Sequence, residues 1–120
     1  MDSTYLLNQR VRALFPQISA SADRCNNAKW EGTNSLWFEC LAQAINADMV
    51  RDVPYSTHRR LFEFMDEAYV EGDEDVRDCI DSSFVENLFW QIASVKCAPY
   101  WSALPPRLRQ LYLDFHRLDP

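Results

Sequence analysis

Residues 56–91 read STHRRLFEFMDEAYVEGDEDVRDCIDSSFVENLFWQ, and this stretch decides the predicted fold. In its first half the apolar side chains recur at the spacing of one helix face: Leu61, Phe64, Met65, Ala68 and Tyr69. Its second half repeats that spacing, with one slip near residues 82–83, through Val76, Cys79, Ile80, Phe84, Leu88 and Phe89. The pattern predicts two amphipathic helices that place their apolar faces at the centre of the core.

The residues between these two helices indicate how they are joined. Gly72 is the residue type that most readily takes the positive φ of a helix C-terminus. Asp73 has the short carboxylate side chain of an N-cap, and the two acids after it lie where a helix N-terminus favours negative charge. The interpretation is a helical hairpin with an acidic corner.

Length and composition are those of one globular domain, which we place at residues 1–120. Only 2 glycines are present, too few for a β-rich fold with many tight turns. No apolar run approaches the ~20 residues of a membrane span, and the first residues lack the pattern of a signal peptide. We therefore expect a cytoplasmic protein without membrane contact. The sequence does not indicate its oligomeric state.

Helices are also predicted on both sides of the hairpin. A first helix is expected from a Ser3 N-cap to Pro16, which cannot continue it. Another is expected to begin at Thr33 or Asn34 and to end near Asp48. Their apolar faces are Leu7, Val11, Leu14 and Phe15 for the first, and Leu36, Trp37, Cys40, Leu41, Ala44 and Ile45 for the second.

The remaining segments have weaker patterns. Residues 17–32 are interpreted as a connection with a short helix near residues 22–26 and with Trp30 as its one large anchor. Pro99 is expected to open a turn, and the Pro105–Pro106 pair to start the last helix. Its buried face would be Leu108, Leu111, Tyr112 and Phe115. The predicted fold is an all-α, single-domain bundle of about five helices with a central acidic hairpin.

Negative charge is concentrated in the hairpin. Between Glu63 and Glu86 the chain has ten acidic residues and one basic residue, Arg77, which gives this segment a balance of −9. The other residues carry +3, and the net charge of the chain is −6. This balance disfavours binding to nucleic acid or anionic lipid and favours a basic protein partner.

Two interpretations of this acidic stretch are open. A solvated face that keeps the protein soluble is the simpler one. However, Glu63, Glu67 and Glu71 stand four residues apart, and like charges at that spacing mildly destabilise a helix. Because solubility does not require such clustering, we favour a docking surface for a basic partner. The predicted contact residues are Glu63, Asp66, Glu67, Glu71, Asp73, Glu74, Asp75 and Asp78.

Motifs for catalysis, metal binding or a cofactor are absent from the sequence, so we expect no enzyme, no metal and no cofactor. The two histidines, His58 and His116, fall near helix ends and are expected on the surface. The segment EGDEDVRDCID is rich in oxygen atoms but lacks the ligand pattern of an EF-hand. A small enzyme remains an alternative only if a polar pocket lies beside one of the histidines.

The cysteines are widely spaced, at Cys25, Cys40, Cys79 and Cys97, with no C-x-x-C pair. Three of them lie on or beside predicted apolar helix faces, and we expect buried thiols there. A disulfide pair or a metal site remains an alternative.

Two stretches carry a family resemblance. Asp81–Leu88 has the pattern D-x-S-F-V-E-N-L, and Tyr100–Tyr112 has the pattern Y-W-x-x-L-P-P-x-L-x-x-L-Y. Together with a helix that ends in Gly and an acidic cap, these patterns resemble small all-helical bacterial immunity proteins of polymorphic toxin systems, such as type VI secretion or contact-dependent inhibition. The resemblance implies a cognate toxin as partner, with a basic surface and a target in the cytoplasm. A helical adaptor without a toxin is the alternative.

Overall fold

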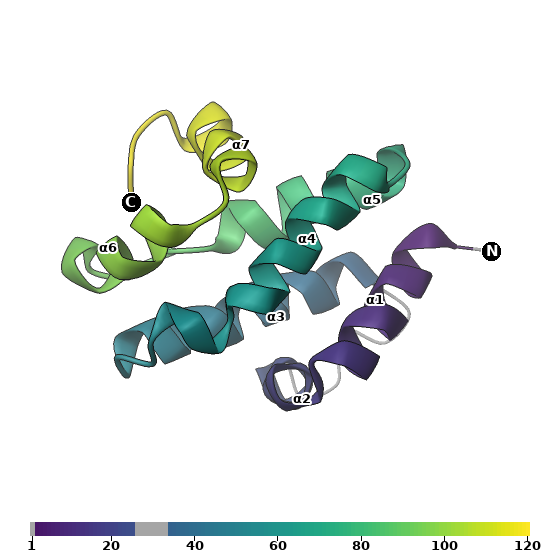
Figure 1. Cartoon of the computed structure of the whole chain (residues 1–120), viewed down its shortest axis with the longest axis horizontal. Coiled ribbons are helices and arrows are strands. Elements are labelled where there is room, and N and C mark those ends of the chain that lie inside the picture. Colours follow the sequence, from purple (N-terminus) through teal and green to yellow (C-terminus); the bar gives the residue numbers. More distant parts are fainter. Residues whose placement is uncertain (1, 26–33) are drawn as a thin grey trace.

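The computed structural model describes residues 2–25 and 34–120, and every regular element within them is a helix (Figure 1). The seven α-helices in these ranges are α1 (Ser3–Leu14), α2 (Pro16–Cys25), α3 (Asn34–Val50), α4 (Arg59–Glu71), α5 (Glu74–Asp78), α6 (Ser94–Ala103) and α7 (Pro106–His116). Three shorter helical segments are η1 (Tyr55–Thr57), η2 (Cys79–Phe84) and η3 (Val85–Asn87). The all-α prediction is confirmed, whereas the predicted number of about five helices is wrong.

The longest helix, α3, lies at the centre of the bundle. Its side chains Trp37, Phe38, Leu41 and Ile45 are completely buried. In Figure 1, α4 runs diagonally across the molecule, with α1 and α2 on one side and α6 and α7 on the other. The described residues pack around one hydrophobic core and form a single compact unit with a radius of gyration of 13.2 Å. None of the helices in the described ranges has the length and apolarity to cross a membrane.

The helix α2 replaces most of the predicted connection after Pro16. Pro16 both ends α1 and begins α2, because proline has no backbone N–H to donate and already has helical φ. Arg12 of α1 donates two hydrogen bonds, of 2.9 and 2.8 Å, to the carboxylate of Asp23 in α2. The indole N–H of Trp37 in α3 donates to the same carboxylate at 2.9 Å. This partly buried network of hydrogen bonds joins α1, α2 and α3. The predicted anchor Trp30 and the predicted cap Thr33 lie outside the described residues.

Two predicted helix ends need correction. The N-cap of α1 is Asp2, not Ser3, since the Asp2 carboxylate accepts from the backbone N–H of Thr4 at 3.0 Å. Gly72 ends α4 as predicted, but its φ is −76°, so positive φ is not the reason for glycine. A Cβ atom at this position would lie 2.5 Å from Cγ1 of Val76 and 2.6 Å from the carbonyl oxygen of Ala68. Glycine is required there because the corner between α4 and α5 is tight.

The second half of the hairpin is less regular than predicted. The short helix α5 is followed by the π-helical turn η2 and the 3₁₀ turn η3. A π-helical turn accommodates an extra residue, which accounts for the slip near residues 82–83. The side chain of the buried Asn46 closes this segment, because it donates to the carbonyl of Asn87 at 2.9 Å and accepts from the N–H of Phe89 at 2.8 Å. Tertiary hydrogen bonds therefore end the helix.

The C-terminal part follows the prediction only in its last helix. Pro99 lies inside α6 instead of opening a turn. The buried Tyr100 anchors this helix, since its hydroxyl donates to the carbonyl of Val53 at 2.8 Å. Such tertiary anchoring offsets the backbone hydrogen bond that proline removes. Pro106 begins α7 as predicted and Tyr112 is buried, but Phe115 of the predicted buried face is 57% exposed.

Candidate functional site: the acidic surface of α4 and α5

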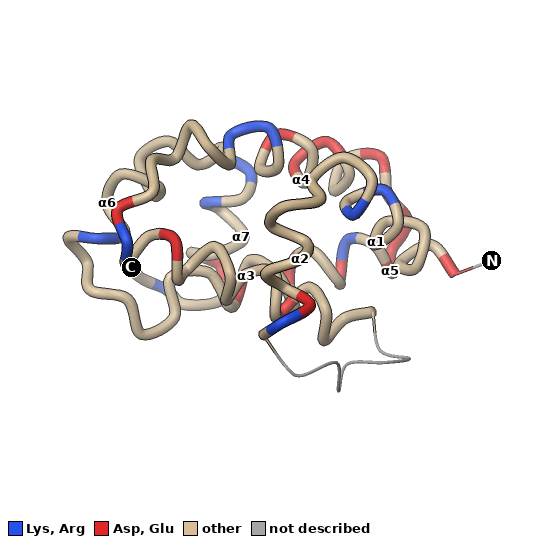
Figure 2. Tube along the Cα trace, turned by 90° about the horizontal axis from the view of Figure 1, so that it is seen from below, with Lys and Arg blue, Asp and Glu red and all other residues tan. Residues whose placement is uncertain are grey.

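We define the acidic surface as the predicted contact residues Glu63, Asp66, Glu67 and Glu71 of α4, Asp73 at the corner, and Glu74, Asp75 and Asp78 of α5. Figure 2 shows these acids along α4 and around α5, toward the end of the molecule that holds the N-terminus. All are exposed except Asp66, which is half-buried. The two helices therefore present one region rich in carboxylates.

Most carboxylates of the acidic surface have no partner within the described part of the chain. No ion pair or side-chain hydrogen bond is formed there by Glu63, Glu67, Glu71, Glu74, Asp75 or Asp78. Arg77, the one base between Glu63 and Glu86, does not neutralise them. Its guanidinium donates to the carbonyls of Tyr69 and Val70, each at 2.9 Å, at the end of α4. The acids thus remain available to an external partner.

The exception on α4 is Asp66. Its carboxylate accepts from Nη1 of Arg107 in α7 at 3.0 Å, and its side chain is 24% exposed. This contact links α4 to α7 and leaves Asp66 less free than its neighbours to meet another protein. Of the predicted contact residues, Asp66 is the one that the described structure pairs with an arginine.

Asp73 has a structural task at the corner. Its carboxylate accepts from the N–H of Val76 at 2.9 Å, which confirms the predicted N-cap, and from the hydroxyl of Ser3 at 3.0 Å. These two hydrogen bonds, first the one from the Val76 backbone, lower the pKa of Asp73 below its ordinary value. Asp73 therefore joins α5 to α1 in addition to being an acid on the surface.

Asp2, which is not among the predicted contact residues, also lies beside α5. Asp2 borders, together with Asp75 and Asp78, a hollow of about 390 Å³. Hydrogen bonds from the side chain and the backbone of Thr4 lower the pKa of Asp2. No pattern in the sequence indicates this position, because Asp2 and α5 meet only through the packing of α1. Groups of three or more residues placed to hold a metal ion are not found among the described residues.

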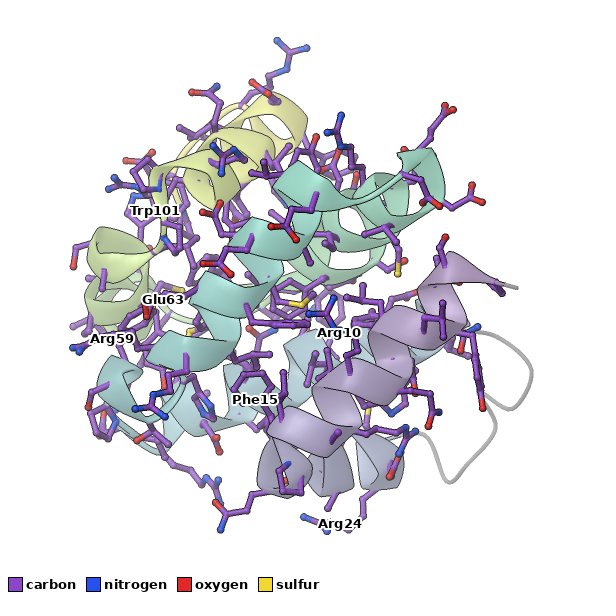
Figure 3. All side chains as sticks on the ribbon, turned by 45° about the vertical axis from the view of Figure 1, so that its right-hand side comes forward. Arg10, Phe15, Arg24, Arg59, Glu63 and Trp101 are labelled. Atoms are coloured by element: carbon purple, nitrogen blue, oxygen red, sulfur yellow. The ribbon has the colours of Figure 1, made fainter. Side chains whose placement is uncertain are left out.

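The α1 side of α4 adds a cation and a hollow. Arg10 reaches from α1 toward α4, where its guanidinium lies 4.9 Å from the centre of the Phe64 ring (Figure 3). Arg10 and Glu71 both border a hollow of about 270 Å³ between α1 and the corner. The acidic surface is therefore limited on this side by one arginine.

Two acids of the hairpin lie elsewhere. Asp81 and Glu86 are half-buried near α7, and the first cause of their raised pKa values is loss of solvent on burial. Asp114 and Asp78 raise the pKa of Asp81 further, and Asp81 does the same to Glu86. The segment with a balance of −9 is thus divided between the acidic surface, which is exposed except at Asp66, and the half-buried pair of Asp81 and Glu86.

The surface position predicted for His58 is wrong. This side chain is 7% exposed, and its Nε2 atom lies 2.8 Å from Oδ2 of Asp48. Arg51 contacts the other oxygen of the same carboxylate. His116 is half-buried, with a ring nitrogen 3.0 Å from the carbonyl oxygen of Glu86. Spacing along the sequence does not show that the chain brings Asp48 back to His58.

The cysteine prediction is largely confirmed. Cys40, Cys79 and Cys97 are buried, whereas Cys25 is exposed at the end of α2, and all four are free thiols. Burial raises the pKa of Cys79 to about 12, which keeps its sulfur protonated and unreactive.

Fold and site together define a class: a small all-helical domain whose most distinctive surface is a set of unpaired carboxylates. Residues 8–118 match the family described as Domain of unknown function (DUF7674), and the chain belongs to this family. Comparisons with curated proteins and with solved structures found no match.

Proposed function

We propose that this domain is a non-enzymatic inhibitor: an immunity protein that binds a cognate bacterial toxin in the cytoplasm through the acidic surface. The observation that carries the proposal is that the Glu67 and Glu71 carboxylates, in the last two turns of α4, have no partner among residues 2–25 and 34–120. The sequence resemblance to immunity proteins supplies the kind of partner.

The position of these acids argues against a role in folding. The C-terminus of a helix is the negative end of its dipole, and negative side chains there are unfavourable. The last turn of α4 has no basic residue, and its first turn has no acidic one but begins with Arg59 and Arg60. Glu67 and Glu71 also repel each other at four-residue spacing. Because no contact within the described residues offsets these costs, a benefit at an interface is the better explanation.

Binding would use the chemistry of charged hydrogen bonds. Lysine and arginine of a toxin would pair with Glu63, Glu67 and Glu71, and such bonds are short and about twice as strong as neutral ones. Many cytoplasmic toxins act on nucleic acid and have basic surfaces, and dense carboxylates would speed association with them. The inhibitor would then cover the surface that the toxin needs for its substrate.

The test is capture of the product of the neighbouring gene, followed by protection of cells that express it. We expect the wild-type domain to bind and protect, and the variant E67K/E71K/E74K/D75K to lose both while keeping its helical circular dichroism. Wild-type protection by a folded quadruple variant would reject the acidic surface. Capture of a basic protein that is harmless to cells would instead indicate an adaptor.

A matched control separates position from total charge. The double variant E67K/E71K and the double variant D114K/D119K change the net charge equally, and all four side chains are exposed. We expect only the α4 pair to weaken binding, by at least tenfold, because removing two charged hydrogen bonds costs roughly 1.5–3 kcal/mol each. Equal weakening by both variants would show that net charge, and not this surface, attracts the partner.

A further inference from the structure

Two of the four cysteines lie against each other where α2 ends beside α3. Cys25 is the last residue of α2, and Cys40 lies in the first half of α3. Their thiols are close enough to share a hydrogen bond. Within the described residues the other two cysteines have different neighbours, since Cys97 donates to a backbone carbonyl at 3.5 Å and Cys79 bonds to a serine hydroxyl. The fold therefore brings one particular pair of thiols together.

The packing of α2 against α3 holds this pair in place. Asp23, two residues before Cys25, accepts at 2.9 Å from the indole N–H of Trp37, three residues before Cys40. Cys25 also borders a hollow together with Ala44 of α3. Because residues four apart in a helix lie on one face, Cys40 and Ala44 both face the end of α2. The contact between the thiols thus agrees with the packing on both sides of it.

The two thiols differ in their access to solvent. Cys25 is exposed, whereas Cys40 is 3% exposed. Burial, and after it the contact with Cys25, raises the pKa of Cys40 to about 12, so this thiol does not attack a reagent first. An accessible thiol that reacts first, beside a second thiol that displaces the reagent, is the arrangement of redox-sensitive cysteines.

A hollow of about 400 Å³ beside Cys25 gives a reagent access to its sulfur. Two guanidinium groups, those of Arg24 and Arg51, border this hollow, and Arg24 marks the end of α2 in Figure 3. The one carboxylate of the lining belongs to Asp48 and is held by His58 and Arg51. Since guanidinium groups pair with carboxylates, a small disulfide that carries carboxylates, such as oxidised glutathione, suits this hollow.

We propose that Cys25 and Cys40 form a redox-sensitive site, which a small disulfide R–S–S–R converts into an intramolecular disulfide. The Cys25 thiolate attacks one sulfur of the reagent, breaks its S–S bond and releases RS⁻, which takes up the proton that Cys25 lost. Cys40 then gives up its proton and attacks the Cys25 sulfur, and the second RS⁻ leaves and takes up that proton. Two protein thiols are thereby oxidised, and one disulfide is reduced to two thiols. The site is separate from the acidic surface and does not depend on the proposed function.

The test treats the dilute full chain with glutathione disulfide and identifies the products by mass spectrometry after digestion. Trypsin, which cuts after lysine and arginine, places the four cysteines in four different peptides, at residues 25–29, 30–51, 78–96 and 97–107. We expect a disulfide between the first two peptides and the release of both halves of the reagent as glutathione. A lasting glutathione adduct on Cys25, a disulfide between two chains, or a bond to another peptide would overturn the proposal.

Two variants and one matched control separate the roles of the thiols. C40A should accumulate the glutathione adduct on Cys25, because no thiol displaces it. C25A should react at least about tenfold more slowly than the wild type, because its remaining thiols are buried. In C25A/Q9C the exposed thiol is moved to α1, and we expect a lasting adduct there. An intramolecular disulfide formed as fast in this control as in the wild type would overturn the proposal, even if C40A failed to fold.

Urea unfolding of the oxidised and the reduced wild type shows whether the bond fits the fold. The midpoint of the oxidised chain should be higher, because the disulfide closes a loop in the unfolded chain between Cys25 and Cys40. A lower midpoint would overturn the proposal, since the two sulfurs would then meet only when α2 leaves α3.

Discussion

The helices α4 and α5 are neighbours on either side of Gly72, and both are acidic. Their charges are nevertheless arranged in opposite order with respect to the helix dipole. In α5, Asp73 caps the N-terminus, Glu74 and Asp75 occupy the first turn, and the one base, Arg77, lies in the last turn. That order follows the helix dipole and stabilises α5.

The order of charges in α4 is the reverse. Two arginines begin this helix, no acid lies in its first turn, and Glu71 ends it. A cluster of like charges therefore need not have one cause. The acids of α5 are explained by local folding, whereas Glu67 and Glu71 have no such explanation and are the better candidates for contact with a partner.

The largest expected effect concerns the corner that joins the two helices. G72A should lower the free energy of unfolding by about 2 kcal/mol, because the new Cβ would overlap Val76 and the Ala68 carbonyl. Urea unfolding followed by circular dichroism measures the change, and V70A on the exposed side of α4 is the control. A stabilised G72A would show that the corner relaxes easily and that the two helices are not rigidly joined.

A smaller effect is expected where the chain leaves α5. Burial raises the pKa of Asp81, so the folded state binds a proton more readily than the unfolded state does. Stability should therefore fall as the pH rises from about 4, the ordinary range of the Asp pKa, through the raised pKa of Asp81. D81N should be more stable than the wild type at pH 7 and no more stable at pH 4.

Urea midpoints at both pH values test this expectation. The control is S82A, because Ser82 is exposed and adjoins Asp81 in the π-helical turn. A D81N variant with the same pH dependence as the wild type would place the titration in another group, such as Glu86.

The smallest effect tests the comparison itself. E71K, in the last turn of α4, should raise stability by about 0.3–1 kcal/mol, and E74K, in the first turn of α5, should lower it by about the same amount. Both substitutions change net charge equally and affect exposed side chains three residues apart. Thermal unfolding at low salt measures the two shifts. Shifts of the same sign would mean that overall charge, and not position in the helix, determines the effect.

The helix α4 could be predicted because its apolar side chains repeat cleanly and Gly72 and Pro54 limit it. Other elements depend on contacts that a sequence pattern does not contain. The buried face of α2 is only Ile18, Ser19 and Ala22, too small and mixed to stand out. The end of the second hairpin segment depends on Asn46, which lies more than forty residues earlier.

The candidate sites show the same division. The acids of the hairpin could be predicted from their density along the chain. Their separation into exposed residues, a cap and the half-buried pair of Asp81 and Glu86 depends on packing against α1 and α7. The buried position of His58 could not be predicted, because its contact with Asp48 of α3 forms only in the folded chain.

The most direct test of the claim that α4 presents its acids for recognition is the rate constant for association with the captured partner. Stopped flow would measure this rate constant for the wild type, E67K/E71K and E74K/D75K at two salt concentrations. We predict that E67K/E71K slows association most, and that added salt removes most of the difference, because attraction between exposed charges is screened. A partner that binds both double variants at the wild-type rate at low salt would contradict the claim that α4 presents its acids for recognition.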